Sequence, residues 1–401
     1  MHPNRPADKY SPLYFLASVG AGGLTVTFFM YLMFWVPHQD RPVPVFEDIF
    51  ATLGAGSVGL KTAIAVALVG IATFVFLNIK YLVWNLKAFL AFRKSDAYES
   101  LKKSNAETTI LAMPLALAMS VNALFIVGLV FVPGLWSIVE YLFPFAMAAF
   151  LAIGVQALIY IGDFLGRVLT NGGVFDVTAH NSFAQMLPAF ALAMIAVGFS
   201  APAAMSTNSV VVGVSLVGST FFGIASVIYA ALALFTAFNS MLHYGTSKET
   251  APTLLIVIPL MTVLGIMAMR QNHGLHATFE AQVTAGETMV LLARLLTVQV
   301  LFGLMGLVVL ARHGYWKSYV IGNETSPGSY ALVCPGVALS VLIQFFVNAG
   351  LVQAGLVDKF SVIYWIVTAI AIAFQFAMIA MVFRLNKQHF GRATSQVVLA
   401  E

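Results

Sequence analysis

Few residues of this chain have the types and spacing that catalysis requires. It holds one cysteine and eight histidines, and the histidines fall in tails, loops or at the ends of apolar runs. His273 and His276 are spaced like metal ligands, but no further ligand stands close by, so we interpret them as part of a solvated loop. A haem needs axial ligands within the bundle, and no phosphate-binding glycine loop or nucleophile elbow occurs. We therefore expect no enzyme activity, no cofactor and no metal.

The single cysteine, Cys334, stands directly before Pro335 inside an apolar run. A lone cysteine excludes an internal disulfide framework and a cysteine metal cluster. A buried cysteine is usually a small, inert hydrophobic residue, and we favour this interpretation. The alternative is a thiol that faces a pore and reacts because its thiolate is stabilised, which would make the chain a thiol-dependent redox or sensor protein.

The even-numbered apolar runs carry Glu140, Asp163, Glu287 and Arg294. Charged groups at membrane depth are costly and usually have a partner. Arg294 lies about two helical turns beyond Glu287, so we expect Arg294 to pair with Glu287 or with Glu140. The alternative is that Arg294 reaches inward between neighbouring helices and takes part in transport.

The overall composition is that of a membrane protein. Of the 401 residues, 60% are hydrophobic and 9% are charged, whereas about 25% are charged in a soluble domain. Runs of about 20 apolar residues can span a bilayer, and the chain has ten, roughly at 13–37, 59–90, 107–132, 136–165, 183–203, 209–239, 252–271, 287–311, 329–353 and 359–384. The sequence predicts an all-α integral membrane domain at 13–388 with tails at 1–12 and 389–401, in contact with the lipid bilayer and without a nucleic-acid partner.

Lysine and arginine are distributed unequally between the two sides of this predicted bundle. One side holds only Arg41, Lys61, Arg270 and Lys359. The other side holds Arg5, Lys9, Lys80, Lys87, Arg93, Lys94, Lys102, Lys103, Arg167, Lys248, Arg312, Lys317, Arg384, Lys387 and Arg392. Because basic loops stay in the cytoplasm, we expect both termini to be cytoplasmic, in a bacterial inner membrane.

Prolines recur at matching places in the odd-numbered runs. LAMPLALAM at 111–119 returns almost unchanged as MLPAFALAM at 186–194. The inner prolines are Pro114, Pro188, Pro259 and Pro335, and Gly20 takes the corresponding place in the first run. Proline inside a helix removes a hydrogen bond and kinks the helix. A membrane helix tolerates such a kink where neighbouring groups satisfy the freed carbonyl. The repeat predicts ten transmembrane helices as five hairpins, with the kinked odd helices in an inner ring around a pore; a solid bundle is the alternative.

This arrangement resembles the tellurite-resistance and dicarboxylate transporter family, which includes plant slow anion channels and fungal malate and sulfite transporters. It also resembles a bacterial branch, the TsoY membrane proteins, some of which carry selenocysteine. The resemblance implies a quasi-fivefold pore for small anions, in a homotrimer. It further implies a phenylalanine plug directly before the ninth-run proline, where this chain has Cys334. Either the pore is wider there, or Leu24, Phe28 or Phe190 fills the gap.

Neutral polar residues of the odd runs are the candidates for the pore lining. They are Thr25, Ser120, Asn122, Thr262, Ser340 and Gln344, together with Thr27 and Asn348. Such donors can replace part of the hydration shell of an anion without trapping it; interhelical hydrogen bonding is the alternative role. Arg270, at the far end of the seventh run, could attract anions at the outer mouth.

We therefore expect an anion channel or transporter that moves a small inorganic or organic anion through a central pore. The alternative is a proton-coupled exporter of an organic acid or of a sulfur, selenium or tellurium oxyanion. Proton coupling needs a titratable group within the membrane, and the uncharged inner runs favour a channel.

Overall fold

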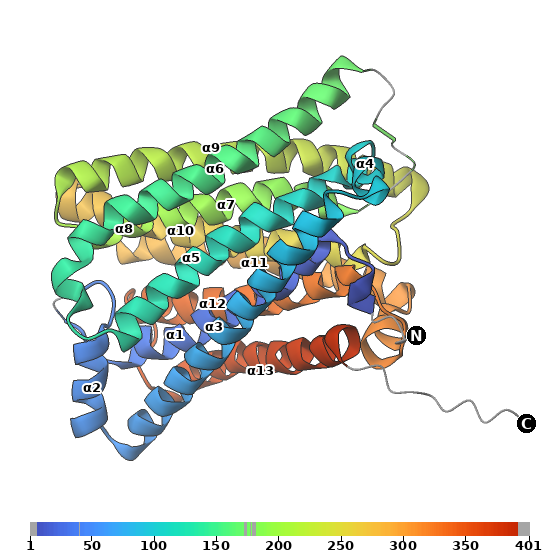
Figure 1. Cartoon of the computed structure of the whole chain (residues 1–401). Helices are drawn as coiled ribbons and strands as arrows, with labels where there is room; N and C mark the ends of the chain where they lie inside the picture. The colour runs from blue at the N-terminus through green and yellow to red at the C-terminus, as the bar shows by residue number, and fades with distance from the viewer. Residues whose placement is uncertain (1–5, 40, 172–174, 177, 179–181, 392–401) are drawn as a thin grey trace, which may run out of the picture.

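The computed structural model of the chain is a bundle of long helices that run roughly side by side (Figure 1). It describes residues 6–39, 41–171, 175–176, 178 and 182–391, so part of the predicted N-terminal tail and most of the predicted C-terminal tail lie outside the described residues. Within these ranges, ten helices are long and apolar enough to cross a membrane, and no residue forms a strand. The prediction of an all-α, multi-pass membrane protein is confirmed.

Each odd-numbered span consists of a short 3-10 helix followed by an α-helix. The α-helices are α1 (Phe15–Trp35), α5 (Ala112–Phe131), α7 (Leu187–Phe199), α10 (Val257–Phe279) and α12 (Val333–Phe345). The 3-10 helices before them are Pro12–Tyr14, Asn105–Leu111, Phe183–Met186, Ala251–Ile256 and Pro327–Leu332. The fifth span is extended by α8 (Ala201–Met205), and the ninth by a π-helical segment, Phe346–Val352.

A serine begins four of these five spans in the same way. The hydroxyl oxygens of Ser11, Ser104, Ser182 and Ser326 each accept a hydrogen bond from the backbone N–H two residues later. A side-chain oxygen at this place satisfies a donor that the first helical turn leaves free. The repeated serine therefore fixes where each of these spans starts.

The inner prolines lie at the start of the α-helices rather than inside them, which corrects the prediction of proline kinks. Pro114, Pro259 and Pro335 are each the third residue of their α-helix, and Pro188 is the second. Proline in the first turn removes no essential α-helical hydrogen bond, and its fixed φ suits that turn. The prolines thus mark the place where the 3-10 helix passes into the α-helix, and their cost is small.

The even-numbered spans are uninterrupted α-helices that carry the lipid-facing surface. They are α3 (Val58–Phe92), α6 (Val139–Thr170), α9 (Ser209–Tyr244), α11 (Ala285–Arg312) and α13 (Val362–Phe390). Large apolar side chains such as Val69, Phe76 and Phe235 are exposed on them, which suits contact with lipid tails. The short helices α2 (Phe46–Ala55) and α4 (Asp96–Lys102) belong to connections.

Burial separates the odd spans from the even ones. In the most apolar stretch of each odd span 67 to 94% of the residues are buried, against 17 to 33% in the even spans. Contacts run from α1 to α5, from α5 to α7, from α7 to α10, from α10 to α12 and from α12 back to α1. Each even helix packs against the odd helix before it and also against the next odd helix of this cycle; α13, the last, packs on α12 and α1. The odd spans therefore form the interior of the bundle.

Buried hydrogen bonds join odd helices to even ones. They connect Ser18 to Asn78, Ser226 to the carbonyl of Ala189, and Gln299 to the carbonyl of Ile258. Between α1 and α13, the Tyr31 hydroxyl donates to Oε1 of Gln375 at 2.6 Å. Bonds of this kind between membrane helices contribute roughly 0.6 kcal/mol each, so they fix the register of the helices more than they stabilise the bundle.

Candidate functional site

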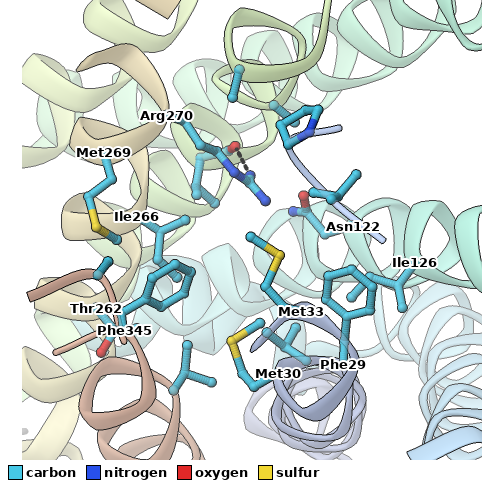
Figure 2. A pocket seen from close by; sticks show the side chains of 18 of the residues that line it. Phe29, Met30, Met33, Asn122, Ile126, Thr262, Ile266, Met269, Arg270 and Phe345 are labelled. Carbon is cyan, nitrogen blue, oxygen red and sulfur yellow. Dashed lines mark hydrogen bonds between the residues drawn. The ribbon is translucent and has the colours of Figure 1, made fainter. Parts of the chain in front are cut away.

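A cavity of about 1050 Å³ lies between the five odd spans. Residues of α1, α5, α7, α10 and α12 all line it. It reaches the surface at the end of the bundle where α1 ends, among the exposed residues Pro37, Gln39 and Lys359. We call this end the mouth. Figure 2 shows side chains from several of these helices converging on the same space.

One face of each odd helix forms the wall of the cavity. On α12 the lining residues Cys334, Val337, Ala338, Val341 and Phe345 recur every three or four positions, which places them on one side of the helix. The same spacing is found on α10, at Pro259, Thr262, Val263, Ile266 and Arg270. The wall is therefore built mainly by the odd helices, and α6 adds Phe143, Ala146 and Phe150 to it.

Three residues form the floor of the cavity, at the end away from the mouth. Phe190, Pro259 and Cys334 line the cavity and also line a separate void of about 10 Å³ beyond it. Phe190 is 2% exposed and Cys334 is 8% exposed. A void of that size holds at most about one water molecule, so the path along the axis is closed at this floor.

The charged side chains that line the cavity are basic throughout the described residues. They are Arg270 and Lys359, with the imidazoles of His38, His273 and His276 near the mouth. The described lining contains neither aspartate nor glutamate. Cations beside a space with low-dielectric walls create a concentrated positive potential, so the described lining makes this cavity electropositive.

Arg270 reaches into the cavity from α10. One terminal nitrogen of its guanidinium donates a hydrogen bond to the carbonyl of Val197 at 2.8 Å. Figure 2 shows the guanidinium pointing across the cavity toward Asn122 of α5. No carboxylate of the described chain lies within 4.0 Å of it. Because a guanidinium carries five N–H donors, most of them are free to bind an anion.

Lys359 supplies the second cation, in the connection before α13 and outside the spans. Its ammonium lies 5.2 Å from the ring centroid of Phe360, within the range of a cation–π contact. Partial burial lowers the pKa of Lys359 below the usual lysine value because the charged form loses hydration. Positive charge at the mouth is therefore lost at a lower pH than for a free lysine.

Several predicted site residues line the cavity. These are Gly20, Asn122, Phe190, Pro259, Thr262 and Cys334. The Thr262 hydroxyl donates to the carbonyl of Ala338 at 3.0 Å and accepts from Nε2 of Gln299 at 2.6 Å. Asn122 donates to a carbonyl four residues earlier in its own helix, at 3.0 Å. Both polar side chains border the cavity while their donors serve the helix bundle.

The other predicted pore residues are not part of the described cavity lining. They are Leu24, Phe28, Thr25, Ser120, Ser340, Gln344, Pro114, Pro188 and Pro335. The ring of Phe28 stacks on Phe74 and lies over Gly70 of α3 so closely that a Cβ there would clash. The hydroxyls of Thr25 and Ser120 donate to carbonyls four residues earlier in their own helices. The helix faces chosen for these residues were thus wrong for Phe28 and its neighbours.

The predicted ion pair of Arg294 is wrong for the described chain. Arg294 is exposed on α11 and belongs to none of the ion pairs formed there. Glu287 instead accepts a hydrogen bond from the N–H of Thr284 at 2.9 Å, in a capping box. Glu140 accepts from the hydroxyl of Ser206 at 2.7 Å. Both carboxylates lie near the starts of their helices. There the donors of Thr284 and Ser206 lie closer to them than Arg294 does.

The histidines and the cysteine do not assemble a metal site within the described residues. No three His, Cys, Asp or Glu side chains of that part come together. His273 and His276 are exposed near the mouth, and Nδ1 of His276 lies 2.8 Å from the carbonyl of Ala281. Cys334 is a free, buried thiol on the cavity floor.

The methionines of the wall were missed by reasoning from the sequence. Met30, Met33, Met119, Met194 and Met269 all line the cavity. A recurring spacing in the sequence could have predicted part of the wall. The residue five or six positions beyond the inner proline, or beyond Gly20, faces the cavity in four odd spans, at Val26, Met119, Met194 and Val341.

The candidate site is thus a deep cavity with apolar walls, a basic mouth, an arginine without an ion-pair partner in the described chain, and a closed floor. Its outline follows from the geometry of the five odd spans. The chain matches none of the protein-family models and none of the curated proteins with which it was compared.

Proposed function

We propose that this protein moves a small anion across a membrane along the axis of the bundle. The observation that carries the proposal is the cavity between the five odd spans, whose charged lining is basic throughout the described residues. The contact cycle of the odd spans supports a quasi-fivefold inner ring with the even helices outside it as the second members of five hairpins. On this view the cavity is the open half of a pore, and Phe190 and Cys334 close the other half.

The positive charges of the cavity suit both the attraction of an anion and its passage along the cavity. Arg270 and Lys359 offer an anion two cations on the way in, one at the mouth and one deeper. Beyond Arg270 the described lining is uncharged, and the amide of Asn122 is a neutral donor that borders it. Binding that is strong enough for entry and weak enough for release is what conduction requires.

A channel is better supported than a proton-coupled exporter. Proton coupling needs a titratable group on the path within the membrane, and the described lining contains no carboxylate. A thiol-dependent redox or sensor protein has less support, because the Cys334 side chain is enclosed at the floor. The exporter remains the second candidate, since histidine side chains line the mouth.

We also propose that the chain belongs to the tellurite-resistance and dicarboxylate transporter family, as a homotrimer of a bacterial inner membrane with both termini cytoplasmic. Support comes from the shared register of the inner prolines at the 3-10 to α junctions. The floor residue Cys334 also occupies the place of the family plug, directly before Pro335.

Anion flux into liposomes that contain the purified protein tests the proposed function. A membrane potential should drive the entry of iodide or nitrate, read by quenching of a trapped fluorophore. Arg270→Gln should lower the flux at least about tenfold, because a charge-assisted hydrogen bond contributes about 1.5–3 kcal/mol. Arg294→Gln is the matched control, since Arg294 is exposed on α11 outside the cavity lining. Flux no greater than in empty liposomes, from folded protein, would refute the proposal.

A further inference from the structure

We infer that the anion accepted by this cavity is an organic monoanion with an apolar body, such as a medium-chain carboxylate or sulfonate; this rests on the proposed anion pathway and names its substrate class. The inference comes from the chemistry of the cavity wall and from the number of free cations within it. The wall disfavours a small inorganic anion, and the number of cations disfavours a dianion.

The wall between Arg270 and the floor is apolar. Arg270 lies eleven residues beyond Pro259 on α10, so about 16 Å along the helix axis separates the backbone of Arg270 from that of the floor residue Pro259. The lining over this depth is dominated by Val, Met, Ile and Phe side chains, including Met119, Met194 and Val341. Thioether side chains adapt their shape to an apolar ligand, and ligand sites are commonly apolar with a few polar groups that fix orientation.

A small inorganic anion would gain little from this part of the cavity. Such an ion is strongly hydrated, and its hydration must be replaced by protein donors. The side-chain donors that border the deeper cavity are few and partly used within the protein, because the Thr262 hydroxyl donates to Ala338 and one amide N–H of Asn122 and of Asn348 donates to a carbonyl of its own span. An alkyl or aryl group, in contrast, gains free energy from the same wall.

The number of free cations distinguishes a monoanion from a dianion. Arg270 is the cation at depth, and Lys359 lies in the connection at the mouth. A carboxylate at Arg270 can take two parallel N–H donors, while the rest of the ligand extends toward Phe190 and Cys334. A second carboxylate placed there would face apolar side chains without a cation, which is costly.

Binding to the purified protein in detergent micelles tests the substrate class. Isothermal titration with acetate, butyrate, hexanoate and octanoate should show affinity rising about fourfold for each added methylene group. Adipate, which is hexanoate with a second carboxylate, should bind at least roughly tenfold more weakly than hexanoate. 1-Hexanol is the uncharged control, and micelles without protein give the background.

Three variants connect this binding to Arg270. Arg270→Gln should weaken hexanoate binding by about tenfold or more and leave 1-hexanol binding unchanged, because only the charge-assisted bond is lost. Arg270→Lys keeps the positive charge but lacks the planar pair of N–H groups that binds a carboxylate through two parallel hydrogen bonds. It should therefore retain part of the hexanoate affinity. Arg294→Gln should bind like the parent. Retained 1-hexanol binding shows that each variant is folded.

The outcomes separate this inference from the proposed function. If affinity is flat along the carboxylate series, or adipate binds as tightly as hexanoate, the substrate class is wrong even where iodide flux into liposomes is measured. If the series behaves as expected but neither iodide nor hexanoate crosses the liposome membrane, the site binds organic monoanions and the transport proposal fails. An equal effect of Arg270→Gln on hexanoate and 1-hexanol would also overturn the assignment of Arg270.

Discussion

Removing the ring of Phe190 should open the floor of the cavity. Phe190 lines both the large cavity and the small void beyond it, and it is the largest of the three side chains that do so. In Phe190→Ala the two spaces should join, which removes the largest side chain of the floor and leaves the residues that enclose the void, such as Leu16 and Leu187, beyond it. We expect anion flux at least about tenfold above the parent, which corresponds to a barrier lowered by about 1.4 kcal/mol.

The same change also costs stability, and the size of the cost is informative. Phe→Ala in a packed core destabilises by about 3–5 kcal/mol. Phe190 borders empty space on two sides, so part of its ring makes no packing contacts, and we expect a loss near the low end of that range. Phe183 is the control: it is fully buried and its ring lies 6.3 Å from that of Phe302, away from the floor.

Paired measurements of flux and thermal unfolding separate these effects. Phe183→Ala should lose more stability than Phe190→Ala and conduct like the parent per folded molecule. Phe190→Ala should conduct more while it melts at a lower temperature. Unchanged flux in Phe190→Ala, together with a stability loss as large as that of Phe183→Ala, would show that Phe190 is ordinary core and that the closure lies elsewhere.

Three further perturbations address other parts of the site. Cys334 should react slowly with a small water-soluble thiol reagent in the folded parent and markedly faster in Phe190→Ala, because both residues share the floor; equal rates by mass spectrometry would contradict this. Anion uptake should fall as pH rises toward the lowered pKa of Lys359, since its ammonium then loses its charge at the mouth, and Lys359→Gln should flatten that part of the profile of flux against pH. Pro114→Ala should change the free energy of unfolding by roughly 1 kcal/mol or less, because Pro114 lies in the first turn of α5; a large loss of thermal stability would restore a structural role for the proline.

The inner position of the odd spans could be predicted from the sequence, but the helix faces could not. The recurring prolines distinguish odd runs from even ones, and burial follows that division. Inside a membrane, however, the lipid and the protein interior are both apolar, so an inner helix shows no polar side that points outward. Phe28 illustrates the difficulty: it turns toward α3 because Gly70 leaves room for its ring, and nothing in the first run alone reveals that glycine.

The predictions for the charged residues differ in outcome, and the contacts around each residue explain the difference. Arg294 and Glu287 lie on the same helix, yet Glu287 bonds to Thr284, which is closer along the chain. Arg270 was predicted as a residue at the far end of the seventh run that could attract anions at the outer mouth. It becomes the central cation because α10 continues to Phe279 and carries it between α7 and α5. Such placements depend on contacts between helices that are distant in sequence.

The packing of α13 against α1 has a consequence for how the protein is made. The first span bonds to α3 through Ser18 and Asn78, but it also has polar partners in the last helix: Trp35 donates to the Tyr364 hydroxyl at 2.9 Å, and the Tyr14 hydroxyl lies 3.0 Å from Nδ1 of His389. During synthesis, α1 therefore enters the bilayer before α13 exists. Until the final hairpin leaves the ribosome, lipid headgroups, water or the insertion machinery must supply hydrogen-bond partners for these polar groups. The start of α1 and the end of α13 lie at the same end of the bundle (Figure 1), so the closing step joins the oldest and the youngest parts of the nascent chain.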